Sequence, residues 1–237
     1  MKKQWFVAGI ITLASVSLLM ACGSSDTKSV AKQEKTTEVT METTESSDSV
    51  DKKEKKGATA SNFSSTKYAD TENMEFAING KVYKLGETTI QTLIDDGVPF
   101  EENSLNNVGN NVNPDYVSDT FKVVVGEYWG LQIWAGNFTD APKATKDLPI
   151  TKIYFPFKKD QTQDILSFNF PTDLSMDDLK ANSGEPTEND HYEGDGGYTS
   201  DNMQYEYESS TYLSKGGYQF NFIKGVLDNI TITYIPR

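Results

Sequence analysis

The sequence predicts an α+β fold in which an antiparallel sheet is joined by two short helices. Three observations lead to this prediction. Most segments beyond residue 73 alternate apolar and polar side chains, which is the period of a strand with one buried face. Asn79-Gly80 separates two such segments and is a favoured pair for a tight hairpin turn. Two short stretches with helical spacing of apolar residues each end in Gly-x-Pro, which stops a helix.

The first half of this region is expected to begin with a hairpin over residues 76–85 and to continue into a helix over 89–96, with Thr88 as its cap. An asparagine-rich loop over 103–113 follows. Strands are then expected over residues 121–125, 131–135 and 150–157. The last strand contains Pro156, which cannot donate a hydrogen bond to a neighbouring strand, so we expect this strand at an edge or a bulge.

The second half is expected to follow the same plan. Ser175 can cap a helix over 176–182, with Asp177 and Asp178 favourably placed in its first turn. A polar loop is expected over 188–202. Three strands complete the chain, over residues 203–208, 218–223 and 229–235.

This recurrence predicts two similar helix-then-three-strand units in tandem, residues 73–160 and 161–237. The segments Thr88–Pro99 and Ser175–Pro186 have equal length, the same Thr or Ser start and the same Gly-x-Pro end. The alternative is a pair of unrelated helix stops, because few residues are identical between the two segments.

The N-terminus has the marks of a secretory signal peptide: Lys2-Lys3, then a short apolar stretch, then Cys22, the only cysteine. Residues 19–22, Leu-Met-Ala-Cys, resemble a bacterial lipobox. The resemblance implies removal of residues 1–21 and a diacylglyceryl group on the Cys22 sulfur. Such a lipid would hold the protein on the outer face of the bacterial cytoplasmic membrane. The alternative is an ordinary signal peptide with a chance cysteine.

Residues 22–72 form a polar segment that is rich in Ser, Thr, Lys, Glu and Asp and has almost no large apolar residue before Phe63. This composition cannot bury enough surface to offset the loss of chain entropy, so we expect a disordered tether. The tether would space the folded part from the lipid; the alternative is a segment with no role beyond solubility. Its length, and Gly23 in place of an acidic residue after the cysteine, favour a Gram-positive cell.

Residues 73–237 are strongly acidic, with 25 Asp and Glu against 12 Lys and Arg. Nucleic acid is therefore not an expected partner, because binding to phosphates requires a basic face. The acidity permits a cationic partner or calcium, and it equally suits a solvated surface. Residues 189–201 offer acidic oxygen atoms for calcium but lack the EF-hand spacing, and the alternative is a solvated turn.

The residues of common catalytic machinery are missing from the sequence. His191 is the only histidine and is expected in an exposed loop, and the only cysteine is assigned to lipidation. A zinc site needs several His or Cys ligands, so no metal site and no cofactor are expected. We expect no enzymatic activity; the alternative is a hydrolase that works with carboxylates alone.

Tyr128 and Trp129 form the sharpest aromatic cluster of the sequence. They precede Gly130 at an expected turn, where an aromatic side chain on a loop can anchor a protein or a sugar. The alternative is packing in the core. Trp134, within the strand over 131–135, is expected to pack.

The second half resembles a known module. The matching residues are Leu174–Leu179, Gly184-Glu185-Pro186, Tyr218–Phe222 and Gly225–Ile230. They are similar to the helix-then-sheet module of outer-membrane assembly lipoproteins of the SmpA/OmlA type and of tandem-repeat beta-lactamase inhibitor proteins. The resemblance covers residues 165–237 well and 76–157 loosely. It implies a tandem module that binds other proteins through its sheet face, and it carries over no site residue.

Together these features favour a membrane-anchored, extracytoplasmic lipoprotein that acts as a non-enzymatic binding or interaction module. The expected partners are the membrane, through the lipid on Cys22, and a protein or polysaccharide ligand. The alternative is a structural or chaperone-like component of the cell envelope.

Overall fold

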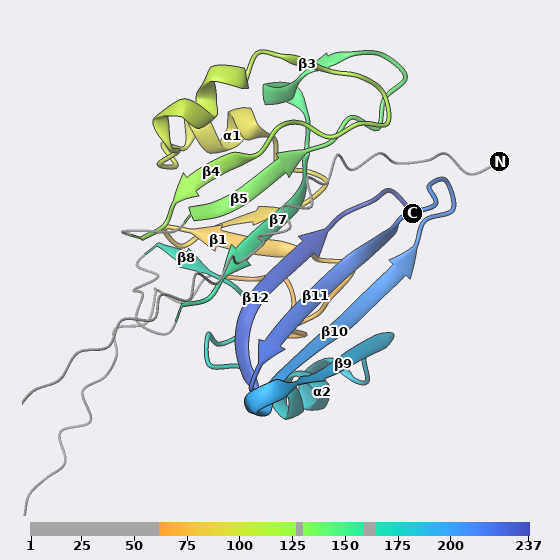
Figure 1. The fold of residues 1–237 in the computed structure, drawn as a ribbon. Coiled ribbons are helices and arrows are strands. Elements are labelled where there is room, and N and C mark those ends of the chain that lie inside the picture. Colours follow the sequence, from red (N-terminus) through yellow and green to blue (C-terminus); the bar gives the residue numbers. More distant parts are fainter. Residues whose placement is uncertain (1–61, 127–129, 159–164) are drawn as a thin grey trace, which may run out of the picture. The chain divides into compact units, whose positions relative to one another are not determined.

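Seven antiparallel strands form the main sheet of the protein. The computed structural model describes residues 62–126, 130–158 and 165–237. Within this part of the chain, the main sheet has the order β4, β5, β7, β12, β11, β10, β9 (Figure 1). In that order the strands span Phe121–Val124, Gly130–Ala135, Ile150–Pro156, Val226–Thr233, Lys215–Ile223, Tyr198–Glu208 and Glu188–Gly194.

Two smaller sheets and two α-helices complete the described fold. One sheet has the order β2, β1, β8, with strands Lys81–Lys84, Glu75–Ile78 and Leu166–Ser167. The other pairs β3 with β6, residues Asn111–Val112 and Lys143–Ala144. The α-helices are α1, Ile90–Asp95, and α2, Met176–Ser183. Three short 3₁₀ helices are η1, Glu102–Asn107, η2, Thr145–Asp147, and η3, Asp195–Gly197. The α+β prediction with antiparallel sheets and two short α-helices is confirmed for these residues.

Two hairpin turns of the sheets have the residue types and main-chain angles that a type I′ turn requires. Asn79 and Gly80 both have positive φ, 52° and 78°, as a type I′ turn requires, and they join β1 to β2. Lys224 and Gly225, with φ of 51° and 75°, make the same kind of turn between β11 and β12. The turn predicted at Asn79-Gly80 is confirmed.

The two α-helices begin at hydroxyl caps. The Ser175 side chain accepts a hydrogen bond from the main-chain N–H of Asp178, as predicted. In α1 the cap is Thr89, whose side chain accepts from the N–H of Thr92, so the prediction of Thr88 is wrong by one residue. The Thr88 hydroxyl instead accepts from the N–H of Lys84, which ties the loop before α1 to the end of β2.

A single row of buried side chains crosses six strands of the main sheet. The row follows the registers of five successive strand pairs, and all of its members are at most 5% exposed. In sheet order these residues are Phe121, Ile133, Ile153, Ile232, Tyr218 and Tyr205. Burial of each large apolar side chain contributes about 1.5–3 kcal/mol before the loss of chain entropy is counted.

The second sheet and both helices cover this buried face. Phe76 from β1, Leu93 from α1 and Leu179 from α2 belong to the same hydrophobic cluster as the row. The Tyr205 hydroxyl donates to the carbonyl oxygen of Gly184 at 2.9 Å, which fixes the end of α2 over β10. Side chains from residues 73–160 and from 161–237 therefore share one main core.

Two predictions about local structure are wrong. The edge position expected for the strand with Pro156 is wrong, because β7 lies between β5 and β12. The alternative, a bulge, is met in part: the pairing of β7 with β5 shifts its register between Trp134 and Ala135, away from Pro156 at the end of β7. Residues 188–202 are not a loop, because β9, η3 and the start of β10 form a hairpin there. Its polar side chains are tolerated since β9 is an exposed edge strand with no apolar face.

None of the helices described in the structure is long and apolar enough to cross a membrane.

Gly217 offers a test of the described register between β10 and β11. Its φ of 141° disfavours any side chain, and a Cβ atom added there would meet the carbonyl oxygen of Tyr205. We expect Gly217→Ala to lower the free energy of unfolding by at least about 2 kcal/mol. Gly109→Ala is the matched control, because nothing lies within 4 Å of its added Cβ, and it should change stability by less than about 0.5 kcal/mol. Urea denaturation measures both, and equal midpoints for the two variants would show that the register is wrong.

Candidate functional site

Several residues predicted as sites lie outside the described part of the chain. Cys22, Tyr128 and Trp129 are among them, and so is most of the predicted tether. The lipid anchor and the Tyr128/Trp129 platform therefore stay predictions, and the site is built from other residues.

His191 lies on the edge strand β9, so its placement in a loop is wrong. Its Nδ1 lies 2.7 Å from Asp201 Oδ1 on β10, and its Nε2 lies 3.2 Å from Glu193 Oε1. The hydrogen bond to Asp201, followed by the one to Glu193, raises the pKa of the exposed imidazole. Both ring nitrogens thus contact carboxylates, and the residue ties β9 to β10. Within the described ranges no group of three or more His, Cys, Asp and Glu side chains could hold a metal ion.

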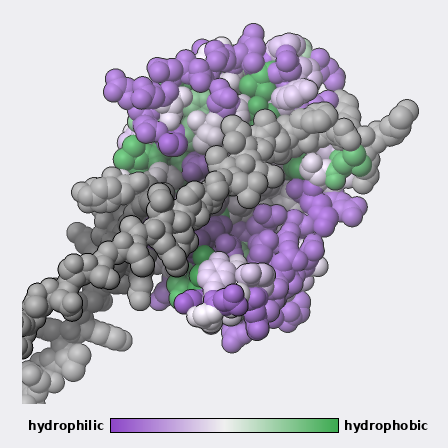
Figure 2. Space-filling model, viewed as in Figure 1, coloured by the Kyte–Doolittle hydropathy of each residue, from purple (hydrophilic) through white to green (hydrophobic). Residues whose placement is uncertain are grey.

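The face of the main sheet opposite the core carries polar side chains, and we call it the polar face. Figure 2 shows hydrophilic residues gathered over the region where Figure 1 draws β9, β10 and β11. The registers align one row across six strands: Lys122, Gln132, Tyr154, Thr231, Gln219 and Gln204. A second row contains Trp134, Lys152, Thr233, Gly217 and Glu206.

The centre of the polar face is open within the described structure. Gln132, Tyr154 and Thr231 are half-buried by their strand neighbours, and none of their side chains forms a hydrogen bond with a described residue. Gln219 donates to Glu206 at 3.3 Å, so this contact also stays within the face. Six strand spacings of about 4.8 Å make the face about 29 Å wide, which is broad enough for a macromolecule.

Trp134, Lys152 and Tyr154 form an aromatic and cationic cluster on this face. Trp134 and Lys152 are directly opposite each other on β5 and β7, and Tyr154 follows two residues after Lys152 on the same side. The Lys152 Nζ lies 5.1 Å from the centroid of the Trp134 indole, a cation–π distance. Trp134 was predicted to pack in the core, and this is wrong, because its neighbours Ile133 and Ala135 take the buried positions.

Lys152 is an incompletely compensated charge. Burial lowers the pKa of its ammonium group, because the charged form loses hydration. No described carboxylate forms an ion pair with it, although the protein carries 35 acidic residues. Beside it, burial and the nearby Asp228 carboxylate raise the pKa of Tyr154, so this phenol stays a neutral donor at physiological pH. An anionic group from outside would complete the surroundings of Lys152.

Charges on the polar face are unevenly distributed. Lys122 and Lys152 lie on β4 and β7, whereas three acidic residues lie at the other end of the sheet. These acidic residues are Glu206 on β10 and Glu188 and Asp190 on β9. The strands between them carry mainly neutral amide and hydroxyl groups, together with Lys215 on β11, which lies 2.9 Å from Glu206, and Asp228 on β12, near Tyr154. A partner with the opposite arrangement of charges would bind in one orientation, since electrostatic complementarity fixes register.

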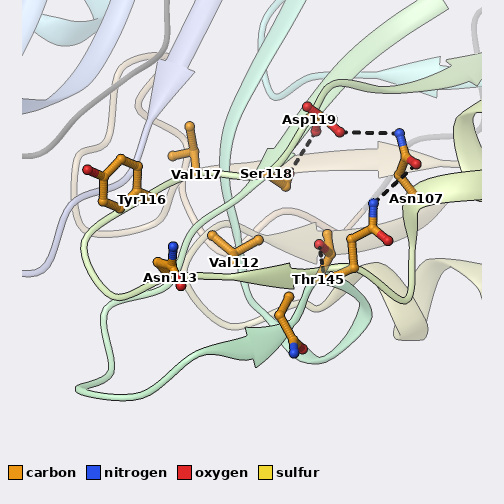
Figure 3. Close-up of a pocket in the computed structure, with 10 residues that line it drawn as sticks. Asn107, Val112, Asn113, Tyr116, Val117, Ser118, Asp119 and Thr145 are labelled. Carbon is orange, nitrogen blue, oxygen red and sulfur yellow. Dashed lines mark hydrogen bonds between the residues drawn. The ribbon is translucent and has the colours of Figure 1, made fainter.

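A second feature is a polar hollow of about 260 Å³ beside β3, which we call the asparagine hollow (Figure 3). It is lined by Asn107, Asn110, Asn111, Val112, Asn113, Tyr116, Val117, Ser118, Asp119 and Thr145. These residues come from η1, β3, the segment before β4 and the start of η2. The predicted asparagine-rich loop thus contains a 3₁₀ helix and a short strand, and its amides gather around one concavity.

The sequence contained a signal for the polar-face cluster. In Thr151-Lys152-Ile153-Tyr154-Phe155, the alternation assigns Lys152 and Tyr154 to the side opposite the buried Ile153 and Phe155. What the sequence could not provide was the strand order, which brings Trp134 beside Lys152 from a strand 18 residues earlier.

Comparisons of this chain with protein-family models, with curated proteins and with solved structures found no match.

Proposed function

We propose that this protein is a lipid-anchored, extracytoplasmic lipoprotein that binds a protein partner through the polar face of its main sheet. The observation that carries the proposal is Lys152, which is half-buried against Trp134 and lacks a described carboxylate partner. Trp and Tyr are typical of the residues that dominate binding energy at protein interfaces, and Lys152 adds a positive charge beside them. Sheet-face binding is also what the resemblance to the outer-membrane assembly module implies.

The chemistry of the face favours a partner of particular character. The partner would place an acidic side chain against Lys152 and basic side chains towards Glu188 and Asp190. Glu206 already forms an ion pair with Lys215 at 2.9 Å. Between these ends, groups that both donate and accept hydrogen bonds would meet Gln132, Thr231 and Gln219. A non-enzymatic role fits this arrangement, because the cluster needs only to bind a charged group and does not activate a nucleophile.

We infer also that the sheet is built from two similar units. The order β4, β5, β7 runs towards the middle of the sheet from one side, and β10, β11, β12 runs towards it from the other. Each trio follows a helix with a hydroxyl cap, Thr89 or Ser175, and the trios meet at the pair β7–β12. This arrangement supports a tandem origin of residues 73–160 and 161–237.

The anchor has a direct test. In cells given a fatty acid with a chemical tag, the full chain should carry the tag and sediment with membranes, because two acyl chains give stable anchoring. Cys22→Ser should carry no tag and appear in the medium, since a hydroxyl does not replace the thiol as the lipid acceptor. Ser24→Ala, two residues away, is the matched control and should behave as the parent does. Tag incorporation into Cys22→Ser would contradict the proposed anchor.

The binding face is tested by photo-crosslinking in living cells with the full chain. A photoreactive amino acid placed at Gln132 or Thr231 should crosslink to one and the same protein. The same amino acid at Thr172, an exposed residue just before α2 and off the polar face, should not. Adding Lys152→Met should weaken the partner's affinity at least about tenfold, because a desolvated charge pair is lost.

Lys146→Met is the matched control for that substitution, since Lys146 is exposed on η2 and lies off the polar face. Crosslinks that are unchanged by Lys152→Met, or that form equally from Thr172, would overturn the binding face. If the polar face crosslinks to a polysaccharide and to no protein, the partner is a wall polymer and the proposed protein partner is wrong.

A further inference from the structure

The asparagine hollow is built almost entirely from neutral polar groups. Four asparagines and two hydroxyl residues line it, together with one phenol and one carboxylate, and none of its lining residues is Lys or Arg. Its apolar lining is limited to two valines. Asn107 and Asp119 lie at one end of the view in Figure 3, and the exposed ring of Tyr116 lies at the other.

Hydrogen bonds within the hollow hold several of these groups in place. The Asn110 side-chain amide donates to Asn107 Oδ1 at 3.2 Å, and the Asn107 amide donates to Asp119 Oδ2 at 3.2 Å. The Thr145 hydroxyl donates to the carbonyl oxygen of Asn110 at 2.9 Å, which fixes the main chain beneath this series. Groups oriented before binding cost less entropy when a ligand arrives.

The same groups keep unused hydrogen-bonding capacity. Each asparagine amide has two donor hydrogens and one acceptor oxygen, and a carboxylate has two acceptor oxygens. The side-chain bonds described above use only Oδ2 of Asp119, Oδ1 of Asn107 and one donor each from Asn107 and Asn110. The side chains of Asn111 and Asn113 form no hydrogen bond to any residue that the structure describes.

We infer that the asparagine hollow binds a neutral sugar residue, either free or within a glycan chain. Neighbouring hydroxyl groups of a sugar each donate and accept, which matches the mixture of amide and carboxylate groups held at fixed spacing. The volume of about 260 Å³ lies just below the range of drug-sized pockets, which suits one ring and not a larger molecule.

Other ligand classes fit the hollow less well. A phosphate or another anion would face Asp119 with no cation among the lining residues to offset the repulsion. An apolar ligand would leave the amides without partners, which costs free energy for each buried group. No cluster of described residues meets the requirement for a metal ion.

The test is a titration of the full chain, kept in mild detergent, with three neutral monosaccharides: D-glucose, D-galactose and N-acetyl-D-glucosamine. Side-chain amide signals of the asparagines are followed by NMR up to about 50 mM sugar. This concentration is well above the dissociation constant of about 1 mM that we expect for a single sugar residue. At least one sugar should shift the signals of Asn107 and Asn110 with saturation. Dextran, galactan and chitin oligosaccharides form a second arm, and tighter binding there identifies a glycan chain as the source of the residue.

Two variants locate the binding. Asn110→Ala and Asp119→Ala should each weaken binding about tenfold, because each removes hydrogen bonds to the ligand. Asn106→Ala is the matched control, since Asn106 is exposed on the same 3₁₀ helix but does not line the hollow. Absence of saturable shifts with all sugars and glycans overturns the inference, and so does binding that both variants retain. Neither result bears on the polar face, which is a separate surface.

Discussion

The pairing of β7 with β12 joins the two halves of the main sheet. It is the one pairing in the described main sheet that joins a strand from residues 73–160 to a strand from 161–237. It buries Ile153 against Ile232 and Phe155 against Ile230 at the middle of the sheet. Without it, each half would expose an apolar strand edge, which is a template for aggregation. The chain has a single cysteine, so no disulfide within the chain could compensate for its loss.

This pairing also creates the surface that we propose to be functional. Because successive side chains of a strand point to opposite faces, burying Ile153 sends Lys152 and Tyr154 to the other face. The joined sheet then presents a continuous polar surface, with Lys122 and Lys152 towards one end and Glu188 and Asp190 at the other. The hydrophobic contacts that stabilise the fold and the proposed binding cluster are therefore consequences of the same alternation.

Local patterns predicted much of this fold, and the pairing of distant strands could not be predicted. The turn at Asn79-Gly80 and the cap at Ser175 depend on neighbouring residues only, and both were correct. Strand β9 was missed because it has no apolar face, and its partner β10 stabilises it through main-chain pairing and through side-chain contacts such as His191 with Asp201. Trp134 was assigned to the core because it is large and apolar. The alternation of side chains along β5 instead places it on the polar face, since Ile133 and Ala135 take the buried positions. The predicted Tyr128/Trp129 platform lies outside the described residues.

Amide hydrogen exchange of the full chain shows whether the β7–β12 pairing joins the two halves into one cooperative core. Mass spectrometry would follow peptides covering Ile150–Pro156 and Val226–Thr233, together with the neighbouring strands β5 and β11. If the β7–β12 pairing joins the two halves, these strands will be among the slowest to exchange and will open with one common free energy. Independent opening of residues 73–160 and 161–237, with clearly different free energies, would contradict the account, because it would show two separate cores.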